Sequence, residues 1–197
     1  MITSITLTKK YAERVGAKCS KTFKFRPGLN LLVGPNGSGK STIFEALQEA
    51  ARGNKGYEPP EGIAVKTSDR ISTHFFDFEK QNVRTLGHFL DGSGGMMFQL
   101  ASKFRSHGEV NRVMGKDLLE NEMVKDGCVM LDEPDQALDH DGVVHLLAWL
   151  KACKAKQVIA AVHHPFIVLQ RDLYVIEMRK GFRADMREHM KAAMGLL

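Results

Sequence analysis

A glycine-rich stretch at residues 34–42 constrains the fold of this chain more than any other feature of its sequence. It matches the pattern G-x-x-x-x-G-K-[ST], and its residues are Gly34, Pro35, Asn36, Gly37, Ser38, Gly39, Lys40, Ser41 and Thr42. An apolar run suited to a buried strand precedes it at residues 29–33, and a helical pattern follows it from residue 43. A glycine-rich turn between a buried strand and a helix predicts a phosphate-binding loop.

The residue types of this loop suit the chemistry of a bound phosphate. Glycines let backbone N–H groups turn inward around the phosphate, and the helix N-terminus adds about half a positive charge at the same place. Lys40 is predicted to contact the β- and γ-phosphates, and the Ser41 hydroxyl is predicted to ligate Mg²⁺. The alternative, a glycine-rich turn with a solvated lysine, leaves the flanking strand and helix unexplained. The loop therefore predicts a nucleotide and Mg²⁺ as ligands.

Length and composition predict one globular domain over residues 1–197. No apolar run approaches the roughly 18 residues that a membrane-spanning helix needs, so we expect no membrane segment. The three cysteines are widely spaced without a C-x-x-C pair, which argues against a disulfide framework or a zinc site. Residues 1–7 read as an alternating strand and not as a secretory signal, so a cytoplasmic location is expected. The net charge of +5 permits a nucleic-acid partner, and an ordinary solvated surface explains it equally well.

The hydrophobic pattern predicts an α/β fold. Residues 2–8 and 19–25 alternate apolar and polar side chains, which indicates two antiparallel strands joined by a loop. From residue 29 onward, strands alternate with helices, and this order favours a mostly parallel sheet covered on both faces. Further strands are expected at residues 63–65, 73–78, 127–131, 158–162 and 172–178, and helices at residues 83–90, 96–104, 106–118, 141–154 and 183–197.

A second motif lies at residues 128–133, where an apolar strand ends in Asp132 and Glu133. Acids at the carboxyl end of a buried strand lie where such sheets bind their ligands. Asp132 is predicted to hold Mg²⁺ directly or through water, and Glu133 to orient and deprotonate the attacking water. Neighbouring strand residues point to opposite faces, so Glu133 reaches the nucleotide only if the strand has ended, which Pro134 favours. The alternative is a strand end with two solvated acids.

These motifs are followed by Ala137-Leu138-Asp139 and by a histidine after the next apolar strand. The order resembles the ATPase head of ABC-type proteins, and more closely the compact SMC-like branch that includes DNA-repair, phage and defence ATPases. The resemblance covers nearly the whole chain. It implies a P-loop NTPase fold with a mostly parallel central sheet, an N-terminal antiparallel β subdomain, a small helical subdomain at about residues 82–125 and a C-terminal tail helix at about residues 183–197.

The resemblance also implies residue roles. Residues 34–42 correspond to the Walker A motif and residues 128–133 to the Walker B motif. Lys40, Glu133 and His163 would be the catalytic residues, with His163 as the switch histidine that senses the γ-phosphate. Asp139 would be the D-loop residue that contacts the other subunit, and Gln81 would lie near Mg²⁺ and the attacking water.

Two serines are candidates for the signature motif, which acts on the nucleotide of a second subunit. Ser106 lies 26 residues before Asp132 and Ser93 lies 39 before it, and the shorter spacing suits one helix and a turn. Ser106, Gly108 and Glu109 are therefore favoured. Ser-x-x-Glu is also a capping box that stabilises its own helix by about 1 kcal/mol. The two roles are compatible, because a capped helix N-terminus can bind a phosphate.

Two further side chains have alternative interpretations. His164 follows the switch histidine and is expected to have a structural role. Tyr11 precedes the phosphate loop where the family often stacks an aromatic ring on adenine, and a partly exposed strand tyrosine is the alternative that we favour.

The sequence therefore predicts an enzyme that hydrolyses ATP to ADP and phosphate as a head-to-head homodimer with ATP between the subunits. The resemblance favours a role in nucleic-acid processing (repair, phage replication or defence), with DNA or a protein such as a nuclease as partner. Two alternatives stay open: the ATPase subunit of an ABC transporter, and a nucleotide-sensing interaction module without turnover.

Overall fold

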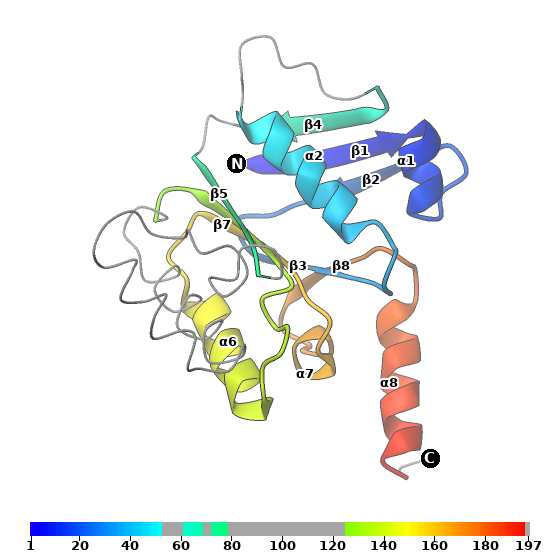
Figure 1. The fold of residues 1–197 in the computed structure, drawn as a ribbon, viewed down its shortest axis with the longest axis vertical. Helices are drawn as coiled ribbons and strands as arrows, with labels where there is room; N and C mark the ends of the chain where they lie inside the picture. Colours follow the sequence, from blue (N-terminus) through cyan, green and yellow to red (C-terminus); the bar gives the residue numbers. More distant parts are fainter. Residues whose placement is uncertain (53–60, 69–71, 79–124, 196–197) are drawn as a thin grey trace.

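The computed structural model describes residues 1–52, 61–68, 72–78 and 125–195, and their strands form two sheets (Figure 1). Sheet A has the order β2-β1-β4 and sheet B the order β5-β6-β7-β3-β8. The strands of sheet A are β1 (Ile2–Thr8), β2 (Ser20–Lys24) and β4 (Ile63–Thr67). Those of sheet B are β3 (Gly28–Val33), β5 (Thr73–Asp77), β6 (Cys128–Asp132), β7 (Gln157–Ala161) and β8 (Tyr174–Glu177).

Every strand pair in sheet B is parallel, which confirms the fold class expected from the sequence. The central strands β6 and β7 are buried at every position, because layers of structure cover both faces of the sheet. All carboxyl ends of the strands meet at one edge of this sheet. The phosphate loop after β3 and the acids after β6 therefore lie at the same edge.

Alternate residues of the central strands face two separate cores. Val129 and Leu131 of β6 pack in a cluster with the apolar face of helix α6 (His140–Ala152). Cys128 and Met130 pack in the opposite cluster, with helix α2 (Lys40–Arg52) and sheet A. Figure 1 shows the same layers, with sheet A and α2 above sheet B and with α6 and the short helix α7 (Pro165–Val168) below it.

Sheet A is antiparallel, as the alternating pattern of its first two strands predicted. The connection between β1 and β2 differs from the expected loop, because it contains helix α1 (Lys9–Arg14). Ala12 of this helix is completely buried, and this packing favours the helical conformation of the short segment. Tyr11 consequently lies on a helix, and the interpretation of Tyr11 as a strand tyrosine is wrong.

The C-terminal helix expected over residues 183–197 is α8 (Phe182–Ala193). None of its residues is buried, and it extends away from the two sheets in Figure 1. The side chain of Arg183 holds it to α7, donating from Nε to Val168 O at 2.9 Å and from Nη2 to Gln170 O at 2.5 Å. The expected helical subdomain, apart from residue 125, lies outside the described residues.

Gln157, the first residue of β7, joins the two sheets. Its side chain is fully buried. Nε2 donates to Ile2 O at 2.8 Å and to Arg26 O at 3.0 Å, and Oε1 accepts from Ile2 N at 3.0 Å. The side chain thus binds both backbone groups of Ile2 in buried hydrogen bonds, and it also binds the segment before β3.

Replacing Gln157 with leucine is expected to lower the free energy of unfolding by about 2–4 kcal/mol, because it leaves buried backbone groups unpaired. Urea denaturation measures the change. Gln170→Leu is the matched control, since Gln170 makes one exposed side-chain bond to Phe166 O, and we expect a change within about 0.5 kcal/mol. Equal effects of the two substitutions would show that Gln157 does not tie the sheets together.

Candidate nucleotide-binding and hydrolysis site

The loop between β3 and α2 has the geometry of a phosphate cradle. A Cβ at Gly34 would lie 2.7 Å from Met178 Cβ and 2.8 Å from Ser38 Oγ, so no side chain fits there. Gly37 and Gly39 have φ values of 73° and 90°, which glycine adopts without strain. The loop is therefore packed closely at Gly34 and open at Gly37, so a phosphate can approach its backbone at the open end.

Lys40 is the first residue of α2, and its side chain lies back across the loop. Nζ donates to Gly34 O at 3.1 Å and to Pro35 O at 3.2 Å, and the residue is 5% exposed. Burial lowers the pKa of the Lys40 ammonium, and three nearby carboxylates oppose this shift. In decreasing order of effect they are those of Glu133, Asp132 and Asp135. The ammonium is thus held between the loop and a set of acids.

Asp132 ends β6 and receives a hydrogen bond from the Ser41 side chain. Its other neighbour is Asp77 at the end of β5, which is paired with it in the parallel register. Burial raises the pKa of Asp132 to about 6, and the charge of Asp77 adds to this shift. Asp132 Oδ1 is buried and has no hydrogen-bond partner among the described residues. An uncompensated buried carboxylate oxygen beside a hydroxyl is a suitable place for a cation.

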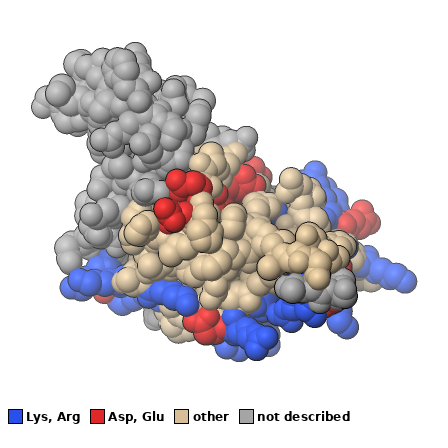
Figure 2. All heavy atoms as spheres, turned by 90° about the horizontal axis from the view of Figure 1, so that it is seen from below, with Lys and Arg blue, Asp and Glu red and all other residues tan. Residues whose placement is uncertain are grey.

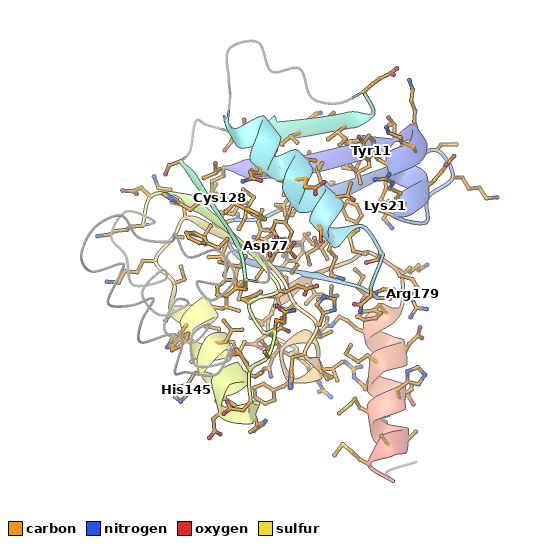
Figure 3. The ribbon with its side chains drawn as sticks, in the orientation of Figure 1. Tyr11, Lys21, Asp77, Cys128, His145 and Arg179 are labelled. Atoms are coloured by element: carbon orange, nitrogen blue, oxygen red, sulfur yellow. The ribbon has the colours of Figure 1, made fainter. Side chains whose placement is uncertain are left out.

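This oxygen donor set fits Mg²⁺, which prefers carboxylate and hydroxyl ligands and keeps several waters or phosphate oxygens. The described part of the chain contains no group of three or more His, Cys, Asp or Glu side chains arranged to hold a metal by themselves. Asp77 is buried among the side chains at the centre of the molecule (Figure 3). This residue was not identified from the sequence, and the available signal was an acid near the end of a predicted strand.

Glu133 follows the last residue of β6, as Pro134 predicted. Its backbone turns sharply, with a φ of 52°, while its N–H still donates to Ala161 O at 3.1 Å. The turn brings Glu133 Oε1 to within 2.9 Å of His163 Nε2. Both side chains are about one-third exposed. The two residues that the sequence assigned to catalysis from different strands are therefore in direct contact.

Two open cavities meet at Glu133. One, of about 250 Å³, is lined by the phosphate loop with Lys40 and Ser41, together with Glu133. The other, of about 310 Å³, is lined by Asn36 and by residues after β6 and β7, including Glu133 and His163. Asn36 and Glu133 line both cavities. A phosphate group bound in the first cavity would therefore lie close to the second.

Asp135 also reaches this region, and the sequence interpretation missed it. The residue is 7% exposed, and its Oδ2 accepts the backbone N–H groups of His163 at 2.7 Å and His164 at 2.6 Å. The available signal was a third acid directly after Pro134.

The remaining predicted residues divide into two groups. Asp139 caps α6, where its Oδ1 accepts from Gly142 N at 2.7 Å, and His164 caps α7, where its Nδ1 accepts from Phe166 N at 3.2 Å. Tyr11 lies on α1 with Lys10 and Arg14 over its ring, at 5.1 and 5.7 Å from the ring centre. The second group lies outside the described residues and consists of Gln81, Ser93, Ser106, Gly108 and Glu109.

Basic side chains do not form one continuous patch on the face drawn in Figure 2. Lys and Arg residues lie along the margin of that face, Asp and Glu residues are scattered over it, and other residues occupy its centre. No described helix is long and apolar enough to cross a membrane.

Comparisons with known proteins agree with this fold. A solved structure of a bacterial Atm1-family ABC exporter with ATP bound superposes with a TM-score of 0.54 at 18% sequence identity. The match covers 96% of this chain, which spans 42% of the exporter chain. At this identity the likeness shows the fold alone. Comparison with curated proteins gave no match.

The sequence itself matches a family. The matched segment is residues 15–118, which is more than half of the chain and includes the phosphate loop. The match agrees with the parallel sheet and with the loop geometry, which are those of a P-loop NTPase. The chain belongs to the AAA domain family.

Proposed function

We propose that this protein binds ATP with Mg²⁺ and hydrolyses it to ADP and phosphate. The observation that carries the proposal is the contact of Glu133 with His163 at 2.9 Å, at the junction of the cavity lined by the phosphate loop and the cavity beside it. Family membership and the P-loop NTPase fold support nucleotide binding. The side-chain contact supports hydrolysis, because it places an acid and an imidazole beside the phosphate cradle.

The residues of the site have distinct roles in this proposal. Residues 34–42 wrap the phosphates with backbone N–H groups, and Lys40 binds the β- and γ-phosphates. Ser41 and Asp132 hold Mg²⁺, which neutralises charge on the phosphates when it is bound. Gln81 is a further candidate ligand outside the described residues.

Glu133 orients the attacking water and accepts its proton. Its contact with His163 restricts the carboxylate to one orientation. His163 can also donate a hydrogen bond to the γ-phosphate, so that the position of the acid depends on whether that phosphate is present.

We further propose that ATP joins two copies of the chain head to head. Both cavities are open among the described residues, so that part of one copy leaves some of the γ-phosphate uncovered. Ser106, Gly108 and Glu109 of a second copy would cover it, and Asp139 would lie at the contact. The proposal also explains how hydrolysis separates the copies, since it removes the phosphate that both of them bind.

The process served by this cycle is proposed to be nucleic-acid processing, with DNA or a partner protein such as a nuclease. The moderate basic charge and the resemblance to compact SMC-like heads support this role. DNA binding that strengthens with ATP and weakens steeply with salt would support it. DNA binding that does not depend on ATP would oppose it.

Glu133→Gln is expected to accumulate an ATP-bound dimer, because the amide keeps the shape of the side chain but cannot accept the proton of water. Size-exclusion chromatography with light scattering, in ATP and Mg²⁺, measures the mass of the complex. The same variant with ADP, and the double variant Lys40→Ala/Glu133→Gln with ATP, are controls that should remain monomeric. A monomer at saturating ATP would exclude the head-to-head arrangement, while phosphate release by the wild type tests hydrolysis separately.

A further inference from the structure

The turn that follows β7 is held by a carboxylate from the turn that follows β6. The last ladder bond at this end of β7 is donated by Val162 N to Leu32 O, at 3.2 Å. The next two backbone N–H groups, of His163 and His164, lie beyond the neighbouring strand. Both donate to Asp135 Oδ2, at 2.7 and 2.6 Å. Asp135 therefore takes the place of a strand partner for the two residues that carry the imidazole groups.

The same two turns are joined a second time by side chains, through Glu133 Oε1 and His163 Nε2. His163 is thus fixed at both ends, its backbone by Asp135 and its ring by Glu133. Glu133 and Asp135 lie two residues apart on one turn. Together they determine the position of the His163 imidazole and its orientation. A charged acceptor forms stronger bonds to N–H groups than a neutral one, and 93% burial of Asp135 shields these bonds from water.

We infer that Asp135 is a positioning residue for ATP hydrolysis, one that acts by holding the backbone of His163 so that its ring meets Glu133. The inference rests on the proposed function. Asp135 is separate from the phosphate cradle, because it lines the cavity beside the phosphate loop and not the cavity that the loop itself lines. Its removal should therefore affect turnover much more than nucleotide binding.

The chain allows a matched set of variants. Asp135→Ala removes the acceptor, and Asp135→Asn keeps an oxygen that can accept both N–H groups. We expect Asp135→Ala to lower kcat about tenfold to a hundredfold with KM changed less than about threefold, and Asp135→Asn to recover most of the loss. Asp172→Ala is the control, since this exposed acid pairs with Lys151 away from the site, and its kcat should be unchanged.

A double-mutant cycle separates positioning from general stabilisation. If Asp135 acts through His163, Asp135→Ala should lower the rate less than about twofold in a His163→Ala protein. A structural role alone would lower the rate by the same factor in both backgrounds. Single-turnover assays with labelled ATP measure the slow variants, and thermal melts with ATP-binding titrations confirm that each variant is folded.

The outcomes distinguish a failure of the Asp135 inference from a failure of the proposed function. Any of three results would overturn the inference and leave the ATPase proposal intact. They are a wild-type kcat in Asp135→Ala, equal losses of kcat in Asp135→Ala and Asp135→Asn, and independent effects of the Asp135 and His163 substitutions in the double-mutant cycle. A wild-type protein that releases no phosphate from ATP would overturn the proposed function, and the role of Asp135 with it.

Discussion

Replacing Lys40 with alanine is expected to weaken ATP binding by about a hundredfold or more, because the ammonium is the one described cation placed within the phosphate loop. The side chain is 95% buried and is oriented by two loop carbonyls, so its position is set before the nucleotide arrives. Its charge also lies among the carboxylates of Glu133, Asp132 and Asp135. Without it, those acids would repel the phosphates directly.

Isothermal titration of the variant with ATP and Mg²⁺ measures the affinity. Burial opposes the charged form of Lys40, so we expect the substitution to leave the protein folded, which a thermal melt checks. Lys191→Ala is the control, since Lys191 lies exposed on α8 with Glu188 as its partner. An ATP affinity in Lys40→Ala within about threefold of the wild type would remove the phosphate-binding assignment of this loop.

Asp132→Asn is expected to change stability and function in opposite directions. Burial, with Asp77 second, raises the pKa of Asp132 from 3.8 to about 6. The folded protein therefore binds this proton more tightly than the unfolded chain does. The free energy of unfolding should fall as the pH rises from about 4 to about 6, by at most about 3 kcal/mol, and remain lower above that range.

An asparagine at this position carries no charge at any pH. We therefore expect the metal-free variant to be more stable than the wild type by about 1–3 kcal/mol at pH 8, and nearly equal to it at pH 4. Its turnover should fall about a hundredfold or more, because a neutral amide is a poor ligand for Mg²⁺. Urea denaturation in a metal chelator at the two pH values, together with phosphate release, measures both effects.

The control for this experiment is Asp172→Asn. A side-chain hydrogen bond from Lys151 lowers the pKa of Asp172, so its charged form is favoured in the folded state and its removal should give no gain in stability. If Asp132→Asn were destabilising to the same extent at both pH values, the buried charge would not be the source of the effect.

The local parts of the site could be predicted from the sequence, because a motif in consecutive residues determines its own backbone. The phosphate loop and the end of β6 at Asp132 are of this kind, whereas His163 was predicted from the resemblance to ABC-type heads and from its order in the chain. The order of the chain also predicted the parallel sheet, since strands and helices alternate from residue 29 onward.

Contacts between distant residues could not be predicted in this way. Asp135 meets His163 only because β6 and β7 are neighbours, and 28 residues separate the two in the chain. Gln157 meets Ile2 across 155 residues, through two different sheets. No periodicity encodes such pairs. The short helix α1 was not predicted for a related reason. Its conformation depends on tertiary packing, such as the burial of Ala12, and not on a local pattern.

The order of strands in sheet B has a consequence for the spacing of the chemistry. β7 separates β6 from β3, so the acid turn and the phosphate cradle are two interstrand steps apart, or about 10 Å. This separation between the ends of β6 and β3 is set by the backbone hydrogen bonds between the strands and not by any side chain. The space between the acid turn and the phosphate loop, which would hold a terminal phosphate and one water, thus depends on the backbone. Substitutions that keep these three strands in their order should leave it unchanged.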